Sequence, residues 1–229
     1  MAVAFLVALA LATSGLHRLA RSRTFQVFGT LVPRVETSRR DVALTFDDGP
    51  TPEAIDEILR LLAVRGVRAT FFVNGAPLAE APGLGARLVA AGHELGNHTY
   101  SHARMVLKPP SAIRDEVERT DALIRAAGEH GEIFFRPPYG WKLVGLPWYL
   151  ARTGRTTVTW DVEPDSPPWG GDAARVADAC VRGVRPGSIV LLHVWWQAPS
   201  RAALPVIIDR LKADGYAFLT VGELLRSRS

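Results

Sequence analysis

Short apolar runs alternate along the chain with stretches in which apolar residues recur at helical spacing. Between residues 52 and 64, for example, Ile55, Ile58 and Leu62 fall on one helical face, and Pro52 takes the first helical position. Such alternation predicts parallel strands with helical crossovers, and so an α/β barrel or a doubly wound sheet. The predicted strands are 41–46, 69–73, 94–96, 133–135, 156–160, 188–192 and 216–221, and the predicted helices are 52–64, 84–91, 111–127, 145–153, 172–184 and 201–213.

Length and composition favour one catalytic domain. The chain has 229 residues, of which 48% are hydrophobic and 22% charged, enough for one sizeable core. The net charge of +4 comes almost wholly from arginine, and no basic block is interleaved with aromatic residues, so we expect no nucleic-acid partner. A single cysteine, Cys180, excludes an intrachain disulfide and is expected to be a small buried residue.

The first sixteen residues form an apolar run that is broken only by Thr13, Ser14 and Gly15. Residues 1–23 are therefore predicted to be a signal sequence or a short membrane anchor, and residues 24–229 the catalytic domain. Basic residues follow this run and none precedes it, which leaves its orientation open. We expect an extracytoplasmic protein, either secreted or associated with the membrane through this segment.

Two adjacent carboxylates, Asp47 and Asp48, end the first long predicted strand, just before Gly49 and Pro50. Neighbouring side chains on a strand point to opposite faces, so both can enter one site only where the backbone turns. Two like charges in one site require a cation or an arginine to neutralise one of them. The pair therefore predicts a metal site nearby, the alternative being a solvated turn.

Two histidines follow the predicted strand 94–96. His98 and His102 are four residues apart, so on a helical turn they would share a face. With Asp48 they would complete a set of two imidazoles and one carboxylate, leaving positions on a divalent ion for water and substrate. The alternative for such a histidine pair is a capping or core role.

Other reactive residues also follow predicted strands, where the chemistry of parallel α/β folds gathers. Arg136 follows residues 133–135 and is a natural partner for the second aspartate. Two prolines after it leave the backbone N–H of Tyr139 as one of the few donors free for a ligand. His193 ends an apolar strand on the same face as Leu191, as either a core residue or an acid or base.

With these motifs the chain resembles the polysaccharide deacetylase family, the NodB-homology domain of carbohydrate esterase family 4. The resemblance runs from about Phe25 to Leu225 and includes five motifs in order, at residues 45–50, 98–102, 136–140, 160–165 and 191–193. It implies a single-domain α/β fold, a deformed (β/α) barrel of seven or eight strands. It also implies metal-dependent removal of acetyl groups from N-acetylated sugar polymers.

The resemblance further implies a role for each matching residue. Asp47 would be the catalytic base, oriented by Arg136, and His193 the general acid. The metal ligands would be Asp48, His98 and His102; Tyr139 would offer its N–H to the oxyanion, and Trp160 and Leu191 would wall the acetyl pocket.

The chain departs from the family pattern in two places. Many members have an Asp-Trp pair in the fourth motif to support the catalytic histidine; here Asp165 is the candidate for that acid, with Asp161 and Glu163 as rivals. After His193, where an acid is common, this chain continues with Val194, Trp195 and Trp196. These tryptophans would either stack on sugar rings or pack against a loop.

The expected cofactor is one divalent metal ion, with zinc first and cobalt or nickel as alternatives, because the ligand set suits all three. The leading prediction is a deacetylase acting on N-acetylglucosamine units of peptidoglycan or chitin-like oligomers. The alternatives are an esterase on an O-acetylated xylan-like polymer, the hydrolysis of a non-sugar amide, or a non-catalytic carbohydrate-binding relic. The presence of every expected ligand, base and acid argues against the relic.

Overall fold

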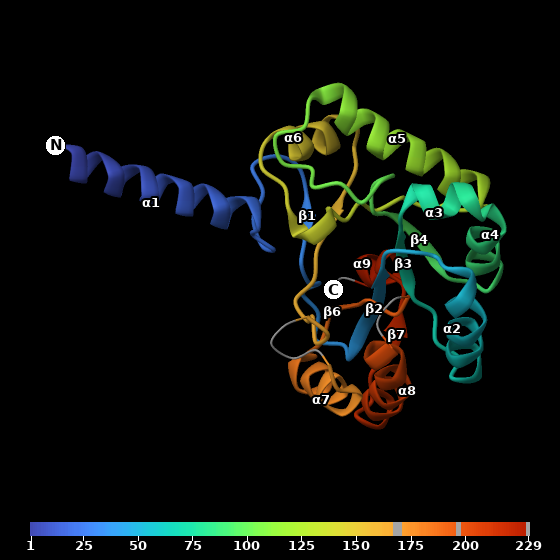
Figure 1. Ribbon diagram of the computed structural model, residues 1–229. Helices are drawn as coiled ribbons and strands as arrows, with labels where there is room; N and C mark the ends of the chain where they lie inside the picture. Colours follow the sequence, from blue (N-terminus) through green and yellow to red (C-terminus); the bar gives the residue numbers. More distant parts are fainter. Residues whose placement is uncertain (167–170, 196–197, 228–229) are drawn as a thin grey trace.

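The computed structural model describes residues 1–166, 171–195 and 198–227, without the side chains of 2–6, 8, 10, 12 and 198. Figure 1 shows parallel strands at the centre and helices packed around them. The elements are α1 (Ala2–Ala20), β1 (Leu31–Val32), β2 (Asp41–Asp47), α2 (Pro52–Val64), β3 (Thr70–Val73), α3 (Gly75–Glu80), α4 (Pro82–Ala90), β4 (Glu94–Asn97), α5 (Pro110–Ala126), the 3₁₀ turn η1 (Pro138–Gly140), α6 (Gly145–Arg152), β5 (Thr157–Val158), α7 (Ala173–Gly183), β6 (Ile189–Leu192), α8 (Ala198–Ala213), β7 (Ala217–Leu219) and α9 (Val221–Arg226).

Strand β2 is the centre of the sheet. It pairs in parallel with β3, β6 and β7, and β4 adds to the outer edge of β3, while β1 pairs with β5. Single bridges link these two parts, since Phe135 pairs with both Asn97 and Thr157, and Val162 pairs with Val190. The ring of strands is thus closed by isolated bridges, which makes it a deformed barrel, as predicted.

Every residue of β2 is buried, because helices and neighbouring strands cover it. Such a strand reads as a nearly continuous apolar run, and its few polar side chains must find partners within the protein. Thr45, for instance, donates a hydrogen bond from Oγ1 to the carbonyl of Val190 at 2.7 Å. Cys180 is buried on α7, as predicted.

Three local predictions were wrong. His98 and His102 do not share a helical turn: β4 ends at Asn97, and the chain continues as a turn in which Thr99 and His102 adopt positive φ. Residues 133–135 form no strand beyond the bridges at Phe135. The last strand stops at Leu219, because Thr220 caps α9 in a capping box with Glu223.

The N-terminal helix α1 projects away from the barrel in Figure 1. Among the described residues, no helix has the length and hydropathy needed to cross a membrane. The residues that follow α1 dock onto the barrel: the backbone N–H of Lys142 donates to the carbonyl of Ala20 at 2.8 Å, and Thr159 Oγ1 donates to that of Arg23 at 2.6 Å. Residues 20–23 therefore belong physically to the wall of the barrel.

Candidate active site

A cavity of about 550 Å³ opens where β2, β4 and β6 end. This is the edge at which parallel α/β barrels collect reactive side chains. Residues from all five sequence motifs reach it directly, together with two arginines that follow α1. The lining residues are Arg21, Arg23, Asp47, Asp48, His98, His102, Tyr139, Gly140, Trp160, Glu163, Ser166, Leu191 and His193.

The three predicted metal ligands converge in this cavity. One ligand atom from each of Asp48, His98 and His102 lies within 4.8 Å of the others. Oδ1 of Asp48 is 3.2 Å from Nε2 of His102 and 3.9 Å from Nε2 of His98. His98 donates from Nδ1 to the carbonyl of Arg136 at 2.8 Å, which leaves its Nε2 as a lone-pair donor toward the cluster.

Left-handed backbone conformations direct two of these ligands. Asp48 has φ 72° and His102 has φ 57°, a region that costs a non-glycine residue about 1–3 kcal/mol and persists only where the surrounding structure holds it. The loop after β4 is held by buried amides: Asn74 Nδ2 donates to the carbonyl of His98 at 2.7 Å, and Asn97 Oδ1 accepts from the N–H of Thr99 at 2.8 Å. The ligand positions are therefore built into rigid backbone.

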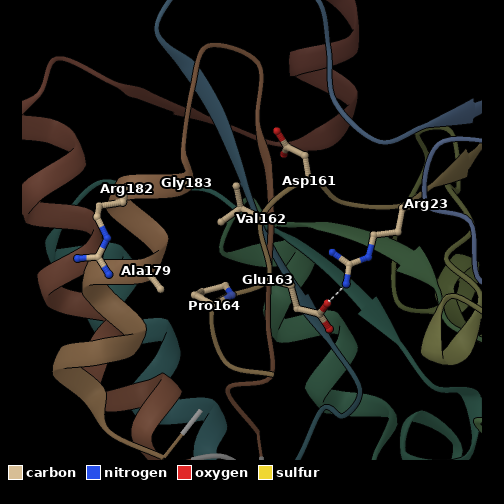
Figure 2. A pocket seen from close by; sticks show the side chains of 8 residues that line it. All are labelled: Arg23, Asp161, Val162, Glu163, Pro164, Ala179, Arg182 and Gly183. Atoms are coloured by element: carbon tan, nitrogen blue, oxygen red, sulfur yellow. Dashed lines mark hydrogen bonds and ion pairs between the residues drawn. The ribbon is translucent and has the colours of Figure 1, made fainter. Parts of the chain in front are cut away.

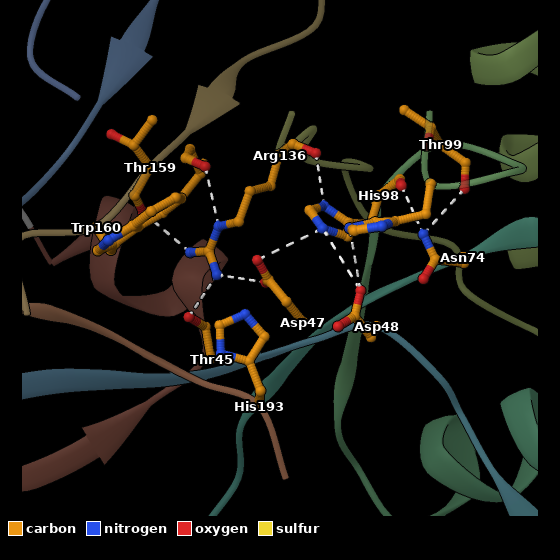
Figure 3. A network of polar contacts seen from close by, with 12 residues as sticks. Thr45, Asp47, Asp48, Asn74, His98, Thr99, Arg136, Thr159, Trp160 and His193 are labelled. Carbon is orange, nitrogen blue, oxygen red and sulfur yellow. Dashed lines mark hydrogen bonds and ion pairs between the residues drawn. The ribbon is translucent and has the colours of Figure 1, made fainter. Parts of the chain in front are cut away.

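Asp47 is paired with Arg136 through Oδ1, while its Oδ2 lies 3.6 Å from Nε2 of His98 (Figure 3). Nη1 of the fully buried Arg136 donates to Asp47 Oδ1 and to Thr45 Oγ1, each at 2.7 Å. The other nitrogens of its guanidinium donate to the carbonyls of Val158 and Thr159 at 3.1 and 2.9 Å. Burial raises the pKa of Asp47, but the charge of Arg136, with smaller contributions from nearby histidines, holds that pKa below its ordinary value.

His193 is paired with Asp165. Asp165 Oδ2 accepts from the backbone N–H of His193 at 2.6 Å, and Oδ1 lies 3.2 Å from its Nδ1. Ser200 Oγ also donates to Oδ2, at 2.8 Å, so the carboxylate is held from two sides. Burial alone would lower the pKa of His193, but the hydrogen bond and charge of Asp165 outweigh burial and raise it to about 9.

The two rival acids are engaged elsewhere. Asp161 accepts from Ser188 Oγ and from the N–H of Ile189, both at 2.9 Å. Glu163 forms an ion pair with Arg23 and accepts from Trp160 Nε1 at 2.9 Å. Figure 2 shows these two acids around a second hollow of about 380 Å³, with Glu163 turned toward Arg23. Of the three acids, Asp165 is the one in contact with His193.

Tyr139, Trp160 and Leu191 all line the cavity, where the resemblance places them. Tyr139 has φ 58°, and within the described residues its backbone N–H has no hydrogen-bond partner. Its ring packs against that of His102 at an interplanar angle of 56°, with 4.6 Å between the ring centroids. Trp160 and Leu191 are buried and give the cavity a firm apolar side.

Trp195 does not offer a sugar-stacking face. It is only 3% exposed, and its ring covers Gly49 so closely that a Cβ at that glycine would lie 2.7 Å from it. This settles the two alternatives for Trp195 in favour of packing. Trp196, and Trp169 further upstream, lie outside the described residues.

Several residues of the site were not found from the sequence. Asn74 and Asn97 brace the His98 loop, and both stand at strand ends, which was a usable signal. Arg21 and Arg23 line the cavity from the segment after α1. Their distance along the chain from every motif gave no sign of this placement.

Comparison with known proteins places this chain in a family. The polysaccharide deacetylase family matches residues 34–158. The chitooligosaccharide deacetylase of Sinorhizobium fredii is 40% identical over 164 residues, which cover 71% of this chain and 75% of that protein. The peptidoglycan-N-acetylglucosamine deacetylase PgdA of Listeria monocytogenes is 30% identical over 199 residues, which cover 84% of this chain and 40% of that longer protein.

Solved structures show the same fold. The Bc1960 peptidoglycan N-acetylglucosamine deacetylase superposes with a TM-score of 0.80 at 30% identity, covering 86% of this chain and 94% of that one. The solved relatives also include one described as a pseudoenzyme, so the fold alone does not establish catalysis. From the extent of these matches, the chain belongs to the polysaccharide deacetylase family.

Proposed function

We propose that this protein is a metal-dependent hydrolase that removes N-acetyl groups from polysaccharides containing N-acetylglucosamine, either peptidoglycan or chitin-like oligomers. One observation carries the proposal: the three-residue ligand cluster, Asp47 with Arg136 behind it, and His193 with Asp165 behind it, meet at one cavity, which the three ligands, Asp47 and His193 line. Its relatives named as deacetylases of these two substrates support the choice of substrate.

The ligand cluster fits one divalent metal ion, zinc first, with cobalt or nickel as alternatives. Two imidazoles and one carboxylate are a common catalytic set for such ions, and His98 already directs its free Nε2 into the cluster. When bound, the ion would supply a Lewis acid that lowers the pKa of water and polarises the acetyl carbonyl. Asp48, His98 and His102 would hold it.

Asp47 acts as the base in this proposal. Arg136 occupies Oδ1 of Asp47 and keeps the carboxylate ionised, so Oδ2 is the atom that takes the proton from water as the water adds to the acetyl carbonyl. The negative charge that develops on the carbonyl oxygen is met by the unpartnered N–H of Tyr139. Trp160 and Leu191 exclude water around the acetyl methyl group.

His193 supplies the proton that the leaving amine needs. Asp165 engages Nδ1 of His193, so Nε2 is the nitrogen left to donate to the sugar nitrogen as the C–N bond breaks. The products are acetate and a free amino sugar. The raised pKa of His193, about 9, keeps this acid protonated at neutral pH.

A polymer substrate of the cell wall requires an extracytoplasmic protein. We therefore propose that residues 1–23 direct the chain to the outside of the cytoplasmic membrane, as an anchor or as a signal sequence that is cleaved within the apolar run, so that residues 20–23 stay docked on the barrel. The apolar run at residues 1–16 supports this placement.

Acetate release tests the proposed function. The full-length protein is assayed on peptidoglycan, chitin oligomers and acetylated xylan, each with chelator and after addition of zinc, cobalt or nickel. We expect metal-dependent acetate release from the first two. Release from acetylated xylan alone would identify an esterase, and no release from any substrate after metal addition would refute the enzymatic proposal.

A further inference from the structure

Two arginines share one tryptophan beside the active-site cavity: Arg21 lines the cavity, and Arg104 contacts Tyr139, which lines it. The guanidinium carbon of Arg21 lies 5.8 Å from the ring centroid of Trp141, and that of Arg104 lies 5.6 Å from the same centroid. The guanidinium carbon of Arg104 also lies 5.3 Å from the ring centroid of Tyr139, whose ring packs against that of His102. The guanidinium of Arg104 is thus separated from a metal ligand by a single aromatic ring.

Neither arginine is neutralised. Across residues 1–166, 171–195 and 198–227, no carboxylate lies within 4.0 Å of the guanidinium of Arg21 or Arg104. The other arginines at the cavity do have partners, since Arg23 pairs with Glu163 and Arg136 with Asp47. Because the carboxylates of the cavity are already paired or committed to the ligand cluster, the rim keeps a surplus of positive charge.

The position of Arg21 is set by the docked N-terminal segment. On one side of it, the carbonyl of Ala20 accepts from the backbone N–H of Lys142 at 2.8 Å, and on the other, the carbonyl of Ser22 accepts from Lys142 Nζ. Lys142 itself directly follows Trp141 in the chain. The backbone of Arg21 is therefore held in place before any ligand arrives, which reduces the conformational entropy lost on binding.

We propose that Arg21 and Arg104 form an anion-binding subsite for a carboxylate or phosphate group carried by the acetylated glycan. A guanidinium can donate two hydrogen bonds to two oxygens of either anion, and a tryptophan face orients the guanidinium plane. The inference rests on the proposed function and refines it: the preferred substrate is an acidic N-acetylated glycan, bound with its anion next to the sugar whose acetyl group is removed.

Kinetic assays of the full-length, metal-loaded protein with three substrates test this subsite. One is the neutral N-acetylglucosamine tetramer, the second is the same tetramer carrying a reducing-end phosphate, and the third is a peptide-free glycan of alternating N-acetylglucosamine and N-acetylmuramic acid, which carries carboxylates. The measured quantity is kcat/KM for each charged substrate relative to the neutral tetramer. We expect a preference for a charged substrate, expressed mainly in KM and weakened by salt.

Arg21→Gln and Arg104→Gln should each reduce this preference about tenfold, because each removes a charge-assisted hydrogen bond. Arg152→Gln is the matched control: Arg152 also lies over a tryptophan, with its guanidinium carbon 4.9 Å from the ring of Trp148, but neither it nor Trp148 lines the cavity, and within the described residues Arg152 has no ring contact to a residue that does. A loss confined to the phosphorylated or to the carboxylated substrate identifies which anion is bound. The same preference in Arg21→Gln and Arg104→Gln as in Arg152→Gln would overturn the subsite.

A binding measurement separates this inference from the proposed function. Calorimetric titration of the two charged substrates should show weaker binding of at least one of them to Arg21→Gln than to Arg152→Gln, whether or not acetate is released. Equal binding of both charged substrates to the two variants counts against the subsite. Absence of acetate from all three substrates counts against the enzymatic proposal alone.

Discussion

Replacing Asp165 by asparagine tests whether His193 owes its protonation to this one carboxylate. Asparagine keeps the size of the side chain and an oxygen that accepts from the backbone N–H of His193, but it removes the charge facing Nδ1. With that charge gone, burial dominates, and the pKa of His193 should fall from about 9 to 6.5 or below. This difference corresponds to about 3 kcal/mol.

The assay is kcat/KM for acetate release from a chitin oligomer between pH 5 and 10, at saturating metal. In the wild type, kcat/KM should fall on the alkaline side with an apparent pKa near 9. In Asp165→Asn it should fall with an apparent pKa at or below 6.5, so that kcat/KM of the variant is about thirtyfold lower at pH 8. The pKa of His193 is raised on folding, so its contribution to stability is full below pH 6.5 and is lost as the pH rises through about 9.

Asp161→Asn is the matched control, because Asp161 belongs to the same loop and binds Ser188 and Ile189 but not His193. In this control, kcat/KM should fall at the same alkaline pH as in the wild type. If the alkaline fall of kcat/KM is unchanged in Asp165→Asn, Asp165 does not set the protonation of the catalytic acid.

The remaining predictions concern the ligands, the acid and a distant carboxyl. Asp48→Ala should lose bound metal, whereas Asp47→Asn should keep it and lose turnover; metal content by atomic absorption with parallel acetate assays separates the two, and an active Asp47→Asn protein would contradict the assignment of the base. His193→Ala should lose amide hydrolysis but retain more activity on an ester with a good leaving group, which needs no proton; equal losses would contradict a role as acid. Burial raises the pKa of Glu94 from 4.5 to about 7, so roughly 3 kcal/mol of stability present below pH 4.5 should be lost as the pH rises through 7. In urea unfolding at pH 4.5 and 8, Glu94→Gln should not show this loss, and an unchanged difference between the two pH values would refute it.

The sequence predicted most of the fold because alternating periodicity is a local property. The helix over 52–64 and the strand beginning at Asp41 appear with nearly the predicted bounds, and both are dominated by burial of an apolar face. The predictions failed where tertiary contacts decide the outcome. Residues 133–135 are apolar, yet only Phe135 reaches both neighbouring strands.

Site residues were predictable where they follow a strand and share a motif. Asp48, His98 and His102 were correctly expected to meet, although the helical turn inferred for the histidines was wrong. Spacing by four residues is compatible with a left-handed turn as well as with a helix, and only the backbone distinguishes them. Arg21 could not be found in this way, because its place depends on how the segment after α1 docks on the barrel.

The conformation of one residue explains how two adjacent aspartates serve different partners. Asp47 ends β2 in the extended conformation and directs its carboxylate to Arg136, on the inside of the barrel. An extended Asp48 would point to the opposite face. At φ 72° its side chain instead turns back toward His98 and His102, into the same cavity. Because Asp48 is left-handed, the two adjacent carboxylates have different partners: Asp47 pairs with a guanidinium, and Asp48 faces two histidines in a set suited to a metal ion.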